Sequence, residues 1–276
     1  MRFAICNEMF EGWEVARVLR FAAETGFDAV EIAPFTIAQH ATSVTPQQRK
    51  EIRRAAEQAG VAVAGLHWIF VGPEGLYLTS PQAETRARTA QYLRHLADLC
   101  ADLGGTHMVL GSPKQRSLLP GVTHEQAMEY AAEVLRAAAP RLEERGVVVG
   151  LEPLAPSETD FLTTAAETRR LVDLVAHPQV KMTLDAKAMS SETTPIPEII
   201  RASRGYVSHF HANDDTKREP GSGSLDFEAI AAALRDTDFQ GYVSIEVFEI
   251  EPDAETMARR GLARLRQAFA AIKEEA

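Results

Sequence analysis

The segment YVSHFHAND, residues 206–214, places two histidines two residues apart in an apolar run, followed closely by an amide and a carboxylate. If the run is a β-strand, His209 and His211 point to the same face, because alternate residues of a strand share a face. A histidine in a buried strand is more often a hydrogen-bonded core residue than a metal ligand. The choice between these interpretations depends on what other strands bring to the same place.

Carboxylates stand near the ends of three other short apolar runs. Glu152 lies in GLEP, Asp185 in TLDA and Glu246 in VSIEVF. A glutamate at a strand end often caps the next helix, but three carboxylates that converge beside an imidazole repel one another unless a cation is present. Oxygen ligands with one nitrogen suit Mn²⁺, Mg²⁺ or Co²⁺, and Zn²⁺ also fits. We therefore interpret His211 as a ligand, and His209 as its neighbour or a core residue.

The elements that must position these side chains follow a regular alternation of short β-rich runs and longer amphipathic segments. Strands are expected at residues 2–6, 28–32, 61–68, 107–111, 147–153, 180–186, 206–212 and 242–248. Two of the helices have recognisable ends: one closes at Gly104, and another begins at a capping box of Thr123 with Gln126 and closes at Gly146. Eight strands, each followed by a helix, predict a single (β/α)₈ TIM barrel.

An open doubly wound sheet is the competing fold. It normally carries a glycine-rich turn after the first strand, and CNEMFEGWE contains no GxGxxG. No linker composition interrupts the chain, so we expect one domain over residues 1–276. In a TIM barrel the functional groups lie at the carboxyl ends of the strands, where Glu31 and His67 would join the residues above.

Composition excludes several other classes of protein. A net charge of −10 disfavours binding to nucleic acid or to an anionic membrane, which needs a basic surface. Cys6 and Cys100 are far apart, so neither a disulfide framework nor a thiolate zinc site is expected. The first residues do not resemble a signal peptide, and no apolar run is long enough to span a membrane. We expect a cytoplasmic protein.

Four motifs carry a family resemblance: GLEP, TLDA, HFHAND with the following EPGSGSLDF, and YVSIEVF. They resemble the sugar isomerase/epimerase superfamily of xylose isomerase-like TIM barrels, and within it the ketose 3-epimerases for tagatose or allulose (psicose) and the inosose-converting enzymes. The resemblance covers nearly the whole chain. It implies a divalent metal, commonly Mn²⁺, bound by Glu152, Asp185, His211 and Glu246. It also implies that the two glutamates exchange the proton on the substrate carbon.

The resemblance further implies several substrate contacts. Glu158 in PSETDF matches a glutamate that contacts the sugar and steadies Glu152, and Trp13 and Phe248 match apolar positions around the pocket. We also expect His67 to contact the substrate.

The chain departs from the family pattern at the substrate-binding positions. Ala188 stands where the family has a histidine, and Lys187 is expected to take over part of that role. Lys217 and Arg218 both stand near a family arginine. The segment GSPKQRS offers further polar groups to the barrel mouth, namely Lys114, Gln115 and Arg116. These differences predict a substrate other than a plain hexulose, such as an oxidised, acidic or cyclic sugar derivative.

Together these features predict a metal-dependent isomerase or epimerase that acts on a ketose or keto-sugar derivative, with proton transfer by the two glutamates through a metal-stabilised enediolate. Dehydration of an inosose or keto-sugar at the same site is the alternative. An endonuclease IV-like DNA repair enzyme is a distant one, because it needs more zinc ligands and a basic face. A sugar-binding protein without catalysis would not need all four ligands. We expect a sugar-like substrate and a homo-oligomer, either a dimer or a tetramer.

Overall fold

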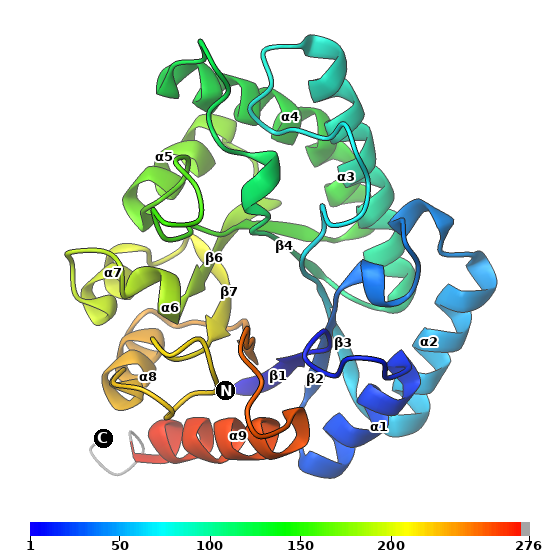
Figure 1. Ribbon diagram of the computed structural model, residues 1–276, viewed down its shortest axis with the longest axis vertical. Helices are drawn as coiled ribbons and strands as arrows, with labels where there is room; N and C mark the ends of the chain where they lie inside the picture. Colours follow the sequence, from blue (N-terminus) through cyan, green and yellow to red (C-terminus); the bar gives the residue numbers. More distant parts are fainter. Residues whose placement is uncertain (272–276) are drawn as a thin grey trace.

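The computed structural model describes residues 1–271, and eight strands in this range form one closed parallel barrel (Figure 1). The strands are β1 Arg2–Cys6, β2 Ala29–Ile32, β3 Ala62–Leu66, β4 His107–Leu110, β5 Val148–Leu151, β6 Val180–Asp185, β7 Val207–Ala212 and β8 Tyr242–Ile245. Neighbours along the chain pair in parallel, and β1 pairs with β8 to close the ring. The predicted (β/α)₈ barrel is confirmed, and the open doubly wound sheet is wrong.

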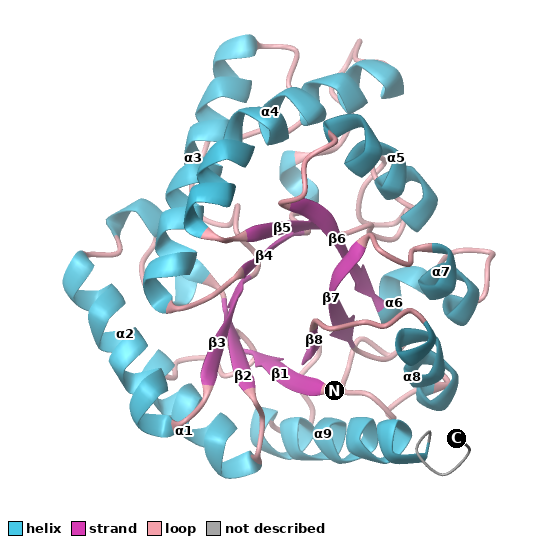
Figure 2. Ribbon diagram, turned by 180° about the vertical axis from the view of Figure 1, so that it is seen from behind, coloured by secondary structure: helices cyan, strands magenta, loops and turns pink. Residues whose placement is uncertain are grey.

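Helices surround the barrel on its outside (Figure 2). They are α1 Val15–Thr25, α2 Pro46–Ala59, α3 Ala83–Leu103, α4 His124–Arg145, α5 Ala165–Val175, α6 Ala186–Met189, α7 Ile196–Ala202, α8 Phe227–Asp236 and α9 Ala254–Ala271. The predicted ends of two of them are confirmed. Thr123 and Gln126 form the capping box of α4, and Gly104 and Gly146 end α3 and α4 in the left-handed conformation that glycine adopts without strain.

The barrel interior changes character along its axis, because alternate residues of each strand point inward. Ala4, Ala29 and Ala64 form a small apolar cluster. Two residues further along their strands the inward side chains are polar, as in Cys6 and Glu31, which lie opposite each other in the β1–β2 register. The main apolar core lies instead between the strands and the surrounding helices. The interior polar groups therefore need partners of their own.

Three strands end two or three residues earlier than the sequence patterns predict, and each of these differences concerns the site. β3 ends at Leu66, so His67 belongs to the following loop. β5 ends at Leu151 and β8 at Ile245, so Glu152 and Glu246 are the first residues after their strands. The polar side chains thus begin the loops at the barrel mouth rather than ending the strands.

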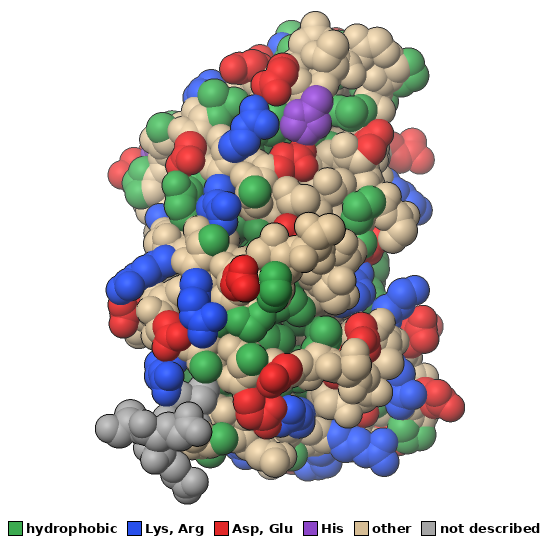
Figure 3. Space-filling view, turned by 90° about the vertical axis from the view of Figure 1, so that its left-hand side faces the viewer, with side chains coloured by type: hydrophobic (Ala, Val, Ile, Leu, Met, Phe, Trp, Pro, Cys, Tyr) green, Lys and Arg blue, Asp and Glu red, His purple; other side chains and the backbone are tan. Residues whose placement is uncertain are grey.

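No helix within residues 1–271 is long and apolar enough to cross a membrane. On the face that carries α5, α7 and α8, acidic and basic side chains are interspersed rather than gathered by sign (Figure 3).

Candidate active site

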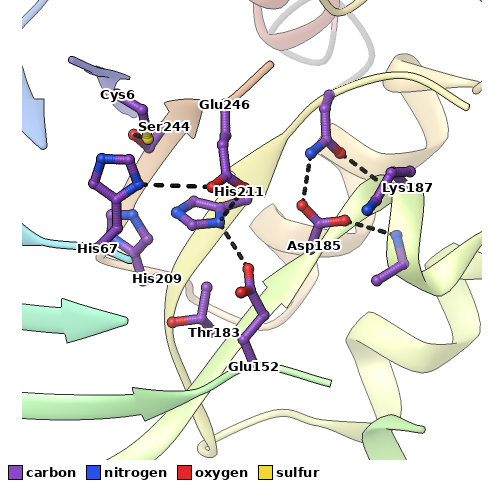
Figure 4. Close-up of polar contacts among 12 residues, drawn as sticks. Cys6, His67, Glu152, Thr183, Asp185, Lys187, His209, His211, Ser244 and Glu246 are labelled. Carbon is purple, nitrogen blue, oxygen red and sulfur yellow. Dashed lines mark hydrogen bonds and ion pairs between the residues drawn. The ribbon is translucent and has the colours of Figure 1, made fainter. Parts of the chain in front are cut away.

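Four consecutive strands bring the four predicted metal ligands together at the barrel mouth. Glu152 and Glu246 follow β5 and β8, Asp185 ends β6, and His211 lies in β7. One ligand atom from each lies within 4.8 Å of the others, and all four side chains are buried. His211 Nδ1 lies 2.7 Å from Glu152 Oε1 and 3.0 Å from Glu246 Oε2 (Figure 4). We call these four residues the mouth cluster.

The charges of the mouth cluster fit a divalent cation. Three carboxylates share one imidazole, so the cluster carries an excess of negative charge in a buried place. Burial, together with the nearby Glu152 and Glu246, raises the pKa of Asp185 from 3.8 to about 7. Burial alone would lower the pKa of His211, but the carboxylates of Glu246 and Glu152 raise it well above its ordinary value. Oxygen donors with one imidazole nitrogen match the preferences of a hard divalent metal ion.

The Asp185 carboxylate is held by two neighbours. Its Oδ1 accepts a hydrogen bond of 2.6 Å from the backbone N–H of Ala188, and so caps the short helix α6. Its Oδ2 accepts one of 2.6 Å from Nδ2 of Asn213, whose own Oδ1 accepts from the backbone N–H of Lys187 at 2.9 Å. Asn213 therefore ties the segment after β7 to the start of α6 and fixes the direction of Asp185.

The Glu246 carboxylate is held by an aromatic residue that the sequence reasoning missed. The indole Nε1 of Trp68 donates a hydrogen bond of 2.8 Å to Glu246 Oε1. Trp68 has φ of 50°, which is uncommon for a bulky residue and is found where surrounding structure compensates the strain. The side chain is 37% exposed, so it meets Glu246 on one side and the solvent-facing mouth on the other.

Glu152 depends on a close backbone approach and on a buried arginine. A Cβ atom on Gly111 would lie 1.8 Å from Glu152 Oε2, so only glycine leaves room for this carboxylate. Arg116 is fully buried, and its Nη1 donates a hydrogen bond of 2.6 Å to the backbone carbonyl of Glu152. Burial lowers the pKa of Arg116 to about 10, which still leaves it charged at neutral pH. Arg116 thus supports the loop after β5 from inside the protein and does not line the cavity.

A second polar group lies next to the mouth cluster, and in it each carboxylate faces a histidine. His209 Nε2 lies 2.7 Å from Glu31 Oε2, and His67 Nε2 lies 3.0 Å from Glu8 Oε2. We call these four residues the histidine layer. It touches the mouth cluster twice, because Glu31 Oε2 lies 3.4 Å from His211 Nε2, and His67 Nδ1 lies 3.6 Å from Glu246 Oε1.

The histidine layer corrects one prediction and agrees with another. His67 is fully buried between Glu8 and Glu246 and is absent from the cavity wall, so it is not placed to contact a substrate. His209 is buried beside the ligand His211 and stacks on His107 at 4.6 Å between ring centroids. This is the neighbouring position expected for it. Glu8 was missed, although it lies only two residues beyond the end of β1.

A cavity of about 880 Å³ opens above the mouth cluster. Glu152, Asp185 and Glu246 form part of its wall, and three predicted substrate contacts lie there too, namely Glu158, Lys187 and Phe248. Lys187 Nζ lies 3.1 Å from both carboxylate oxygens of Glu158 and 4.4 Å from the ring centroid of Phe248. Burial alone would lower the pKa of Lys187, but Asp185 and Glu158 raise it. A charged pair of Lys187 and Glu158 therefore forms part of the cavity wall.

The structure does not bring Trp13 to the cavity. Its ring packs against Phe10 and Phe21 at centroid distances of 5.1 and 5.8 Å, and the guanidinium of Arg17 covers it at 3.4 Å. The loop after β1 folds back onto α1, and this apolar cluster takes up the indole.

The side chains of Lys217 and Arg218 do not line the cavity, although the backbone carbonyl of Lys217 accepts a hydrogen bond of 2.9 Å from the N–H of Phe248 in its wall. The side chain of Lys217 is 57% exposed and lies 3.7 Å from Glu249, and Arg218 lies 3.3 Å from Glu251. The loop that carries them is organised around Asp214, whose carboxylate accepts backbone hydrogen bonds from Gly221 and Leu225. These internal contacts direct both cations toward acidic residues of the next loop instead of the cavity.

Comparisons with known proteins agree with this geometry. A family model described as "Xylose isomerase-like TIM barrel" matches residues 19–268. The chain is 25% identical over 252 residues to 3-dehydro-D-guloside 4-epimerase of Escherichia coli (strain K12), with 89% of this chain and 92% of that protein covered. It is 28% identical over 233 residues to D-psicose 3-epimerase of Agrobacterium fabrum, with 82% and 76% covered. A crystal structure of a D-psicose 3-epimerase, studied in the presence of D-fructose, superposes on the chain with a TM-score of 0.85 at 23% identity. The superposition covers 98% of this chain and 99% of that one, and it shows the shared fold.

Proposed function

The chain belongs to the xylose isomerase-like TIM-barrel family, and we propose that it is a divalent-metal-dependent epimerase or isomerase of a ketose or keto-sugar derivative. The observation that carries the proposal is the mouth cluster, where two glutamates approach the same imidazole nitrogen from opposite sides beside a large cavity (Figure 4). Two opposed carboxylates are what inversion at a carbon next to a carbonyl requires. One must take a proton from one face, and the other must return a proton to the opposite face.

The residues of the chain divide this work between them. Glu152, Asp185, His211 and Glu246 would hold the metal, which when bound polarises a substrate carbonyl as a Lewis acid. Glu152 and Glu246 accept and donate the proton at the substrate carbon. The indole of Trp68 orients Glu246, and the carbonyl of Glu152 is anchored by Arg116. The pair of Lys187 and Glu158 offers hydrogen-bond donors and acceptors to substrate hydroxyls.

We propose Mn²⁺ as the preferred metal, because the mouth cluster has three carboxylates, one imidazole and no sulfur. We propose a keto-sugar derivative rather than a plain hexulose as the substrate, because Ala188 and the Lys187–Glu158 pair replace the usual histidine environment. The relative from Escherichia coli is named for a 3-dehydro-guloside, which is such a derivative. Cytoplasmic location and a homo-oligomeric state stay predictions.

The type of reaction can be identified by NMR. The protein would be incubated in D₂O with Mn²⁺ and a panel of ketohexoses, 3-dehydro-glycosides and inososes. Deuterium should enter one carbon of the true substrate next to its carbonyl, with inverted configuration for an epimerase. Transfer between adjacent carbons would instead indicate an isomerase, and loss of water a dehydratase. Failure of every keto-sugar to exchange hydrogen or change configuration would contradict the proposal.

A further inference from the structure

The cavity is larger than one sugar ring requires. Its volume of about 880 Å³ lies near the upper end of the roughly 300–1,000 Å³ of small-molecule sites. Three residues of the mouth cluster form part of its wall, namely Glu152, Asp185 and Glu246. The remaining wall comes from the loops after β3, β4 and β5 and is largely apolar, with Val71, Pro73, Leu76, Pro113 and Leu154 among its residues. A hexulose bound to the mouth cluster would leave this outer part filled with water.

The loops that form the outer part are tied to one another. The backbone N–H of Leu78 donates a hydrogen bond of 2.7 Å to the carbonyl of Gln115, and the hydroxyl of Tyr77 donates one of 2.9 Å to the carbonyl of Ser117. The Ser117 hydroxyl in turn lies 3.1 Å from that of Thr159 in the third loop. These hydrogen bonds connect the three loops of the wall to one another, as expected of a preformed binding site.

The outer part has one cationic and one anionic side chain from the loops after β3 and β4, and aromatic side chains beside it are partly exposed to solvent. Lys114 and Glu74 are the two ionisable side chains that the loops after β3 and β4 contribute to the wall within the described residues. Trp68 and Phe248 stand at the boundary with the mouth cluster and are 37% and 38% exposed. Exposed aromatic faces beside an apolar wall suit an uncharged, flat or ring-shaped group.

From these observations we propose that the outer part is a subsite for the aglycone of a keto-sugar glycoside, and that the aglycone is uncharged and apolar on at least one face. We call it the aglycone subsite. The inference rests on the proposed function, because it assumes that the keto-sugar ring meets the mouth cluster. It goes further in assigning the rest of the cavity and in making a glycoside, not a free ketose, the preferred substrate.

The test compares three substrates that differ only beyond the sugar ring: free 3-dehydro-D-gulose, its methyl glycoside and its phenyl glycoside. Burial of the phenyl ring should raise kcat/KM about tenfold or more over the methyl glycoside. Val71→Asn, which makes the subsite wall polar, should reduce the phenyl-to-methyl ratio severalfold. Ile250→Asn is the matched control, because Ile250 is 44% exposed and lies outside the cavity wall, and it should leave the ratio unchanged.

Binding of unreactive ligands separates this inference from the proposed function. Calorimetry with phenyl and methyl β-D-glucopyranoside should show tighter binding of the phenyl compound, weakened by Val71→Asn, with circular dichroism as the check on folding. Equal binding and equal kcat/KM for both glycosides would overturn the aglycone subsite while leaving the epimerase proposal intact. Tighter phenyl binding without turnover of any keto-sugar would retain the subsite and contradict the proposed reaction.

Discussion

The mouth cluster and the histidine layer contain the same kinds of side chain in different proportions. In the histidine layer each carboxylate has its own imidazole: Glu31 faces His209 and Glu8 faces His67. In the mouth cluster three carboxylates share His211. Burial does not separate the two groups, because Glu31 and Glu246 are both almost inaccessible to solvent. The difference lies in charge balance and in access to the cavity.

This comparison identifies which acidic residues require a cation. In the histidine layer each carboxylate lies within 3.0 Å of its own imidazole, so carboxylates and imidazoles are equal in number. The mouth cluster has two carboxylates more than imidazoles, and it opens on the cavity. The histidine layer also orients two ligands of the mouth cluster, because Glu31 contacts His211 and His67 contacts Glu246.

The largest effect should come from a carboxylate that exchanges the substrate proton. Glu246→Gln is expected to lower kcat about 10²–10⁴-fold, because an amide cannot accept that proton. The matched control is Glu8→Gln in the histidine layer, where we expect a loss of about tenfold, the low end of the range for orienting groups, because Glu8 reaches Glu246 only through His67. Turnover of a confirmed keto-sugar substrate measures both. Equal losses in the two variants would remove the functional distinction between the groups.

Metal content should separate the groups in the same way. Elemental analysis is expected to find about one divalent ion per chain in the wild type and loss of that ion in His211→Ala. Glu31→Gln should retain the ion with an affinity about 10–100-fold weaker, because Glu31 orients the ligand His211 without being a ligand. Retention of full metal content by His211→Ala, in protein shown to be folded by circular dichroism, would contradict the ligand assignment.

The metal-free protein should lose stability as pH rises, and Asp185 is the group to examine. Its pKa rises from 3.8 to about 7 on folding, so its stabilising contribution is fully present below 3.8 and is lost as pH approaches 7. Within that window the slope is about 1.4 kcal/mol per pH unit in the free energy of unfolding. Urea unfolding of chelator-treated protein at pH 5, 6 and 7 measures it. Asp185→Asn should flatten the dependence, and identical slopes in both proteins would contradict the argument.

The fold and the ligands could be predicted because local patterns determine them. Short β-rich runs mark the strands, and a closed barrel gathers whatever follows their carboxyl ends, so Glu152, Asp185, His211 and Glu246 had to come together once the barrel was assumed. Trp68 could not be predicted this way. Its indole reaches Glu246 only because the residue adopts a positive φ after β3 has ended.

The substrate contacts were harder to predict, because they depend on the course of long loops. Lys187 and Phe248 lie within three residues of the ends of β6 and β8 and reach the cavity. Glu158 lies in the middle of the loop after β5 and reaches the cavity as the partner of Lys187. Trp13, Lys217 and Arg218 belong to loops that satisfy their own apolar and charged groups, and no residue pattern indicates this. Resemblance to a family therefore predicted the substrate contacts near strand ends better than those in the long loops.

The smallest effect is expected in the loop of residues 214–227. In the structure Lys217 and Arg218 pair with Glu249 and Glu251 at the surface, and Asp214 holds the loop together. Exposed ion pairs of this kind contribute little free energy. The double variant Lys217→Ala, Arg218→Ala should therefore change kcat/KM less than about twofold. The comparison variant is Lys187→Met, which removes the cation beside Glu158 in the cavity wall and should mainly raise KM. A large loss of kcat/KM in the double variant would show that the loop moves onto the substrate during turnover and that its place here is only one of two.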